Sequence, residues 1–204
     1  ALDMPAGPSE VMVIADAGAD ARAVALDLLS QAEHGPDSQV VLLTTDAELV
    51  DAVAQAITDA LPGLPRRDII EKALANSLMV LVASLEEACE VANDYAAEHL
   101  IIQVNKPRQL LEKISNAGSI FLGAWTPESV GDYCSGTNHV LPTYGYARSY
   151  SGLSLSAFQK QISVQELTRA GLEGLAPTVV TLAELEGLEA HAQAVKVRLQ
   201  RGAR

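Results

Sequence analysis

Apolar runs of four to six residues recur along the first 122 residues, and helical patterns lie between them. Such short runs are typical of strands that are buried on both faces, as in parallel sheets. A strand, a helix and a second parallel strand form the repeating unit of these sheets. We therefore predict an α/β domain in which helices cover both faces of a mostly parallel sheet. The expected strands are residues 11–15, 39–44, 78–83, 100–104 and 119–122.

Capping residues mark where the intervening helices begin. Asp20 is an expected N-cap, and the pairs Thr45–Glu48 and Ser84–Glu87 match the capping-box pattern. Glycine and proline at positions 35 and 36 end the first helix, because neither residue continues a helix well. The expected helices are residues 20–33, 46–60, 66–75, 85–97 and 107–118.

The pattern changes after residue 122. Residues 123–152 hold five glycines, the only tryptophan and four of the five tyrosines, without strand or helix periodicity. A loop of this length within a domain is usually functional. From about Ser154 we expect a helical tail, with Ser163 and Glu166 as a capping box. The tail has too few bulky apolar residues for its own core. The expected divisions are a remnant of a preceding domain and linker (1–10), the α/β domain (11–153) and the tail (154–204).

Composition restricts the partners. The chain has 204 residues, of which 49% are hydrophobic, which suits a folded domain. Its net charge of −12 disfavours nucleic acids and anionic membranes, which need a basic surface. No apolar run is long enough to cross a bilayer, and the first residues do not resemble a signal peptide. Cys89 and Cys134 have no disulfide-framework spacing, so we expect free thiols in a reducing cytoplasm.

Two pairs of polar residues are candidates for chemistry. Gln31 and His34 are three residues apart at a helix end, so they could offer two ligands to one metal. Alternatively, His34 could be a histidine that the helix dipole favours at the C-terminal end of a helix. Glu98 and His99 stand where a helix gives way to a strand, and they could be two acid–base groups or a solvated pair. Ligand sites normally follow strands in parallel sheets, whereas this pair precedes one.

Two further groups are weaker when taken alone. Asp132, in a glycine-containing loop, is a possible oxygen ligand. Glu186 and His191 are five residues apart in the tail, and that spacing does not put them on one helix face, so His191 could be a surface residue. A site made of two histidines, an aspartate and a glutamine or glutamate would suit zinc or manganese. Such nitrogen and oxygen ligands differ from the thiolates of structural zinc sites. Spacing alone does not decide whether these groups meet.

Seven segments together resemble the histidinol dehydrogenase family, and they extend over essentially the whole chain. The most specific are Gly131-Asp132-Tyr133 and the run from Ser135 to Thr143, SGTNHVLPT. The others are DMPAGPSEV (3–11), LLSQAEHGPDS (28–38), EHL (98–100), GSIFLG (118–123) and PES (127–129).

The resemblance implies roles for individual residues. It implies an incomplete Rossmann-like domain in which Glu98 and His99 form the acid–base pair. It also implies two sets of ligands. The zinc ligands would be Gln31, His34, Asp132 and His191, and the substrate contacts would be Ser9, Gln31, His34, His99, Asp132, Glu186 and His191. His139 lies in a matching segment without an assigned role.

The implied reaction is the oxidation of L-histidinol to L-histidine through the aldehyde, with zinc and two NAD. The chain resembles only the C-terminal half of a subunit, so NAD contacts are not assigned to any residue. The resemblance also implies a homodimer in which the tail is exchanged between subunits. Two alternatives remain at this point, namely a zinc-dependent hydrolase with Glu98 as base and a fragment without catalytic activity.

Overall fold

A computed structural model describes residues 5–200, and the chain divides into two compact units, Ala1–Phe158 and Gln159–Arg204. The first unit contains a five-stranded sheet in the order β3-β2-β1-β4-β5, and every neighbouring pair is parallel. This confirms the predicted α/β class. The strands are β1 (Glu10–Ala15), β2 (Gln39–Thr44), β3 (Leu78–Leu81), β4 (His99–Gln103) and β5 (Ser119–Leu122).

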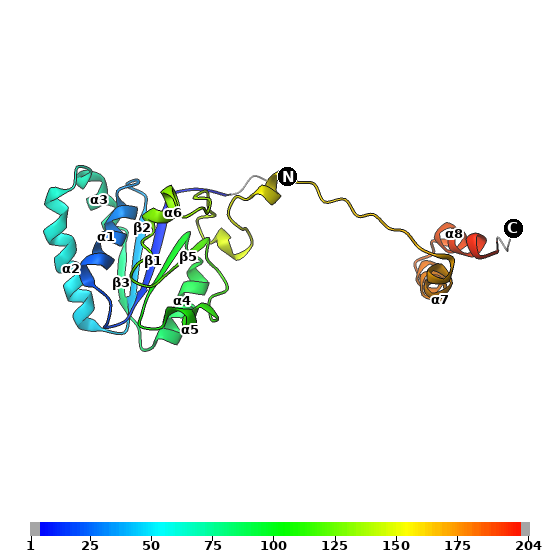
Figure 1. The fold of residues 1–204 in the computed structure, drawn as a ribbon, viewed down its shortest axis with the longest axis horizontal. Coiled ribbons are helices and arrows are strands. Elements are labelled where there is room, and N and C mark those ends of the chain that lie inside the picture. The colour runs from blue at the N-terminus through cyan, green and yellow to red at the C-terminus, as the bar shows by residue number, and fades with distance from the viewer. Residues whose placement is uncertain (1–4, 201–204) are drawn as a thin grey trace. The chain divides into compact units, whose positions relative to one another are not determined.

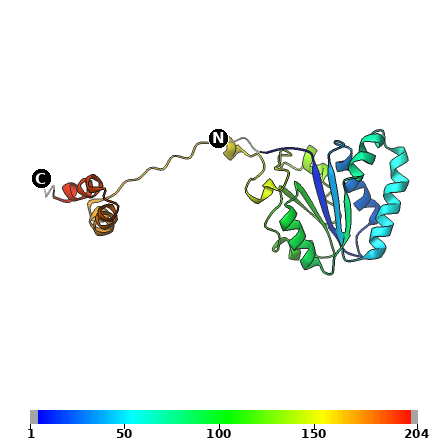
Figure 2. The same ribbon diagram turned by 180° about the vertical axis from the view of Figure 1, so that it is seen from behind.

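Helices cover both faces of the sheet (Figures 1 and 2). Alternate residues of β1 enter two separate cores: Val11 and Val13 pack with α1, α2 and α3, whereas Met12 and Ile14 pack with α4 and α5. This alternation follows from the two-residue period of a strand. The helices of this unit are α1 (Ala21–Ala32), α2 (Ala47–Ala60), α3 (Arg67–Leu74), α4 (Leu85–Tyr95), α5 (Pro107–Leu111) and α6 (Ser129–Tyr133), with the 3-10 turns η1 (Leu61–Gly63), η2 (Tyr146–Arg148) and η3 (Leu155–Phe158).

The helix starts confirm two predicted caps and correct one. Asp20 and Ser84 accept hydrogen bonds from the first-turn amides of α1 and α4. The cap of α2 is Asp46 instead of Thr45, because the Asp46 side chain reaches the amide of Glu48. The expected helix 107–118 is also too long, since α5 ends at Leu111. The chain beyond it is held instead by the side chain of Asn93.

The long loop after β5 contains a short helix and a tight turn near the start of β1. The short helix is α6, which the sequence patterns did not predict. Tyr144 and Gly145 have φ values of 53° and 73°, in the left-handed region. The turn is fastened to the residues before β1, because Thr143 donates its amide to the carbonyl of Pro5 and accepts the amide of Gly7 on its side-chain oxygen. The loop is therefore part of the amino end of the sheet.

The second unit consists of α7 (Arg169–Leu185) and α8 (Glu189–Gln200), which pack on each other through small residues such as Ala183 and Ala192. The expectation of a continuous helix from Ser154 is wrong. Residues 159–168 are irregular and exposed, and Thr168 caps α7, so Ser163 and Glu166 form no capping box. Many apolar side chains of the pair remain exposed, as expected for a tail without a full core. Within residues 5–200, no helix has the length and apolar character needed to span a membrane.

Candidate active site

The acid–base candidates lie at the amino end of the sheet, where β4 begins between β1 and β5. His99 pairs in register with Val11 of β1 and with Ser119 of β5. Glu98 and His99 are both buried. Gly118, next to them, has no space for a side chain, because a Cβ there would lie 2.5 Å from the carbonyl oxygen of Glu98. The close approach of these two segments fixes the position of Glu98, just before β4 begins.

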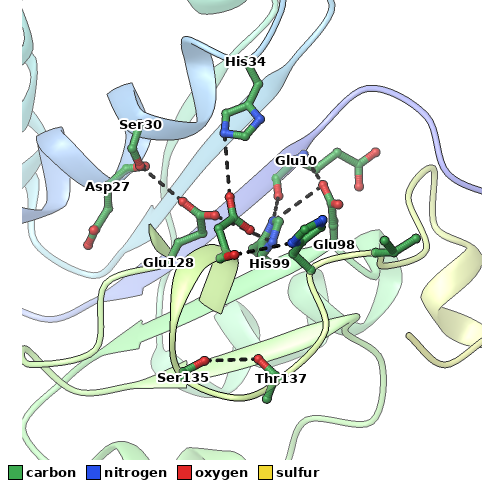
Figure 3. Close-up of polar contacts among 12 residues, drawn as sticks. Glu10, Asp27, Ser30, His34, Glu98, His99, Glu128, Ser135 and Thr137 are labelled. Carbon is green, nitrogen blue, oxygen red and sulfur yellow. Dashed lines mark hydrogen bonds and ion pairs between the residues drawn. The ribbon is translucent and has the colours of Figure 1, made fainter. Parts of the chain in front are cut away.

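A single residue, Glu10, contacts both members of the pair. Its backbone amide donates to Oε2 of Glu98 at 2.9 Å, and its carbonyl oxygen lies 3.0 Å from Nδ1 of His99. Oε2 of Glu98 is 3.5 Å from the same ring nitrogen. Both groups therefore face the Nδ1 side of the imidazole, and Nε2 points elsewhere (Figure 3).

Carboxylates lie on the Nε2 side of His99. Oε1 of Glu128 is 3.8 Å from Nε2. One potential ligand atom from each of His99, Glu128 and Asp132 falls within 4.8 Å of the others, so this group could hold a metal ion. Oδ2 of Asp132 is also 4.0 Å from Nε2 of His34. Two ligands of a tetrahedral zinc, each about 2.1 Å from the metal, are about 3.4 Å apart. His34 and Asp132 are therefore nearly at the spacing that a shared zinc requires.

Gln31 has an unusual environment for a buried amide. Its side chain is fully buried in the last turn of α1, and neither its Oε1 nor its Nε2 has a hydrogen-bond partner. Such groups are rare because burial without a partner costs free energy. His34 follows the helix in a turn, and its amide donates to the carbonyl of Gln31. An unpartnered amide oxygen beside His34 fits a metal ligand.

Burial shifts the protonation of this cluster. The pKa of Glu98 is raised to about 8, chiefly by burial and further by the charges of Glu10, Asp132 and Glu128, while the hydrogen bond from the amide of Glu10 lowers it. Burial also raises the pKa of Glu128, and Asp132 adds to this effect. Burial lowers the pKa of His99. Without a cation, burial therefore favours the neutral forms of Glu98, Glu128 and His99.

The remaining candidates are placed as follows. Ser9 is half-buried just before β1, and its carbonyl accepts the amide of Gln39. Nδ1 of His139 lies 3.4 Å from the carbonyl oxygen of Asp132. Glu186 is the C-cap of α7 and His191 lies in α8, so both belong to the second unit, and their part in the site stays a prediction.

Two residues of the site, Glu10 and Glu128, had no assigned role in the sequence analysis. Glu128 lies in the PES segment and Glu10 in the first segment, so both were within the recognised motifs. Glu10 forms no spacing pattern with the other site residues, because its partners Glu98 and His99 lie almost 90 positions away. Glu128 is four positions before Asp132, a helical spacing that was not recognised as a signal. Residues 3 and 4 of the first segment (3–11) lie outside the residues that the structure describes.

The fold and these contacts define a class of protein: a parallel α/β domain with a buried acid–base pair next to a candidate metal site at the amino end of its sheet. Residues 1–199 match the family model for histidinol dehydrogenase. Histidinol dehydrogenases from Vibrio cholerae serotype O1 and Vibrio vulnificus (strain YJ016) are 61% and 60% identical over 201 residues, which is 98% of this chain and 47% of each relative.

A solved structure gives the same result. The crystal structure of histidinol dehydrogenase from Elizabethkingia anophelis matches with a TM-score of 0.95 and 50% identity, over 97% of this chain and 46% of that one. This chain belongs to the histidinol dehydrogenase family. It spans about half the length of the curated relatives that it matches.

Proposed function

We propose that this chain carries the acid–base and zinc-binding half of an enzyme that oxidises L-histidinol to L-histidine with NAD. The observation that carries the proposal is the buried His99, which has Glu98 on its Nδ1 side and Glu128 on its Nε2 side. Family membership supports the reaction, and the site supports the chemistry, because alcohol oxidation needs a base for the hydroxyl proton.

The proposed zinc ligands are Gln31, His34, Asp132 and His191. The distance between His34 and Asp132 supports the set, as do the unpartnered amide atoms of Gln31. A neutral nitrogen, a carboxylate and an amide oxygen are donors that suit zinc. The same ligands, together with Ser9, His99 and Glu186, would contact the substrate. Zinc would supply a Lewis-acid contact that holds the imidazole and amino group of histidinol in one pose.

The protein groups would then move protons. Nε2 of His99 would accept the hydroxyl proton in each oxidation, and the lowered pKa of His99 keeps its ring neutral for this task. Glu98 would activate the water that adds to the aldehyde, which requires its ionised form. Because burial raises the pKa of Glu98, a nearby cation would be needed for it to be ionised at neutral pH.

The hydride acceptor and the partners come from outside this chain. Zinc has no redox chemistry, so NAD would take the hydride. The exposed apolar side chains of α7 and α8, such as Leu182 and Leu185, support a homodimer in which the tail is exchanged between subunits. The net charge of −12 gives no support for a nucleic acid or membrane partner. The free thiols of Cys89 and Cys134 support a cytoplasmic location.

The test supplies the part of the relatives that this chain does not span. We would co-express this chain with the N-terminal half of the Vibrio cholerae relative, purify the complex, measure its zinc content, and follow NADH absorbance after adding L-histidinol and NAD. We expect two NADH for each histidinol. A folded, zinc-loaded complex that forms no NADH would contradict the proposal, and turnover without NAD would favour a zinc-dependent hydrolase.

A further inference from the structure

The peptide groups of Glu10 hold both acid–base residues, although Glu10 lies almost 90 positions before them. Its amide bonds to Oε2 of Glu98, and its carbonyl oxygen contacts Nδ1 of His99. As the first residue of β1, Glu10 stands opposite Gln39 of β2, while its amide turns toward Glu98. One residue therefore fixes the directions of a carboxylate and an imidazole on the neighbouring strand.

These contacts determine which ring nitrogen of His99 carries hydrogen. A carbonyl oxygen only accepts hydrogen bonds, so at 3.0 Å it requires a hydrogen on Nδ1. The second acceptor on that side, Oε2 of Glu98, lies at 3.5 Å, whereas the acceptor nearest to Nε2, on Glu128, is at 3.8 Å and beyond hydrogen-bond range. The shorter acceptors all lie on one side of the ring.

We infer that Glu10 is a positioning residue that holds His99 as the Nδ1–H tautomer, with the lone pair of Nε2 directed toward Glu128 and the proposed metal ligands. The inference rests on the proposed function, because it names what prepares His99 to act as a base. The hydrogen bond to the other nitrogen sets which nitrogen of a histidine is free to react.

The side chain of Glu10 has a separate part in this arrangement. Its Oε1 accepts the amide of Tyr144, one of the two consecutive left-handed residues in the turn, while Oε2 is buried without a partner. The carboxylate therefore fastens the turn to the start of β1. Without it, the strand start would lose its contact with the loop but keep both peptide groups.

The tautomer is tested directly on this chain, without the relative's N-terminal half or a metal. Histidine labelled with ¹⁵N would be followed by NMR at a pH where the ring of His99 is neutral. We expect a pyrrole-type signal for Nδ1 and a pyridine-type signal for Nε2. The opposite pattern, or an average of the two, would overturn the inference.

Two substitutions separate the peptide groups from the carboxylate. Glu10→Ala removes only the side chain, whereas Glu10→Pro also removes the amide that reaches Glu98. Proline is tolerated at the first residue of a strand. In the reconstituted complex, we expect Glu10→Pro to lower kcat by a further 10-fold or so below Glu10→Ala, on the order of a second-shell effect, with KM little changed. Equal kcat values would overturn the role of the amide.

Two matched variants serve as controls for these substitutions. Glu10→Gln retains an acceptor for Tyr144 and should restore kcat toward wild type. Tyr95→Phe removes the hydrogen bond to Gln39 near the same strand end, and should leave the His99 signals and kcat unchanged. If Glu10→Pro does not fold, the tautomer of the wild-type chain decides the outcome. If the wild-type complex produces no NADH, the proposed function fails while the NMR result still stands.

Discussion

The two ends of the sheet differ in how their polar groups are satisfied. At the carboxyl end, the side chain of Asp16 accepts the amides of Gly18 and Asn105, and Asp20 accepts two amides of α1. At the amino end, Glu10, Gln31 and Glu128 all have buried side-chain atoms without hydrogen-bond partners. One further such atom among the described residues belongs to Gln103, at the other end of β4.

The difference bears on where the proposed site lies in this sheet. Parallel sheets usually bind ligands beyond the carboxyl ends of their strands, at the point where the strand order reverses. Here, at that point between β1 and β4, the side chain of Asp16 accepts amides from the segments that follow both strands. The amino end instead receives the last turn of α1 and the loop that carries Asp132. Most of the buried polar atoms without partners among the described residues therefore support the amino end as the place of the proposed site, although the general rule for the fold would favour the other end.

The largest expected effect comes from removing His99, the proposed base at the amino end. His99→Asn should lower turnover of the reconstituted complex by about 10²- to 10⁴-fold, the usual contribution of a general base, while zinc stays bound. Asp16→Asn at the carboxyl end should leave turnover unchanged. The measurement is NADH formation together with metal content, and similar losses in the two variants would remove the distinction between the two ends.

Metal affinity is the next comparison. His34→Ala and Asp132→Ala should each weaken zinc binding by more than about 100-fold, beyond the range of residues that only support a ligand. His191→Ala should also weaken binding in the full complex. Competition with a chromophoric chelator measures these affinities. Unchanged affinity in His191→Ala would show that the tail supplies no ligand.

The third prediction concerns pH and stability in metal-free protein. The pKa of Glu98 is about 8 in the folded chain against an ordinary 4.5, so the folded state keeps a proton that the unfolded state loses. Stability should therefore fall as pH rises between these values. Glu98→Gln should flatten the dependence of stability on pH. Near pH 9 it should stabilise the sheet by about 1–5 kcal/mol, where the upper bound is the whole pKa shift of Glu98 converted to free energy.

The measurement for Glu98 is urea denaturation followed through NMR amide signals of β1 and β4. The measurement is made above about pH 7 to exclude His99. Because the pKa of His99 is lowered, its contribution makes stability fall only as the pH drops below the ordinary pKa of histidine. Glu87 is an exposed control at the carboxyl end, where its side chain accepts the amide of Ala83. A Glu87→Gln variant with the same alkaline stabilisation would show that burial of Glu98 is not the cause.

The smallest expected effect is at the carboxyl end. Asp20→Ala removes the N-cap of α1 and should lower stability by about 1 kcal/mol. Zinc affinity should not change, because Gln31 and His34 are at the other end of the helix. A loss of zinc affinity comparable with that of His34→Ala would mean that the two ends of α1 are coupled.

Local signals were sufficient for most of the fold. The strands were predictable because each is an apolar run, although only β1, β2 and β4 are largely buried. The caps Asp20 and Ser84 were predictable because they act within three residues of their own position. The errors arose where a local pattern had no packing to support it. Ser163 and Glu166 have the spacing of a capping box, but the segment around them is exposed and forms no helix.

The site was less predictable because its contacts are not local. Glu98 and His99 were found through adjacency, and Gln31 and His34 through helical spacing. The contacts of Glu10 and Glu128 depend instead on strand order and on the return of the loop from β5. No periodicity encodes the contacts of Glu10, whereas Glu128 has a four-residue spacing to Asp132 that was not recognised as a signal. The family segments contained both residues, but only the folded sheet gives each of them a partner.

The separation between Glu10 and its two partners bears on how the protein is made. A growing polypeptide that has reached only β3 contains Glu10 but neither of the residues that its peptide groups hold. At that stage a divalent ion would find only Gln31 and His34, two donors at one helix end. The next proposed ligand, Asp132, follows β5 in the chain. We therefore expect metal uptake to come after all five strands have been made, so that the ion binds to a sheet that is already formed.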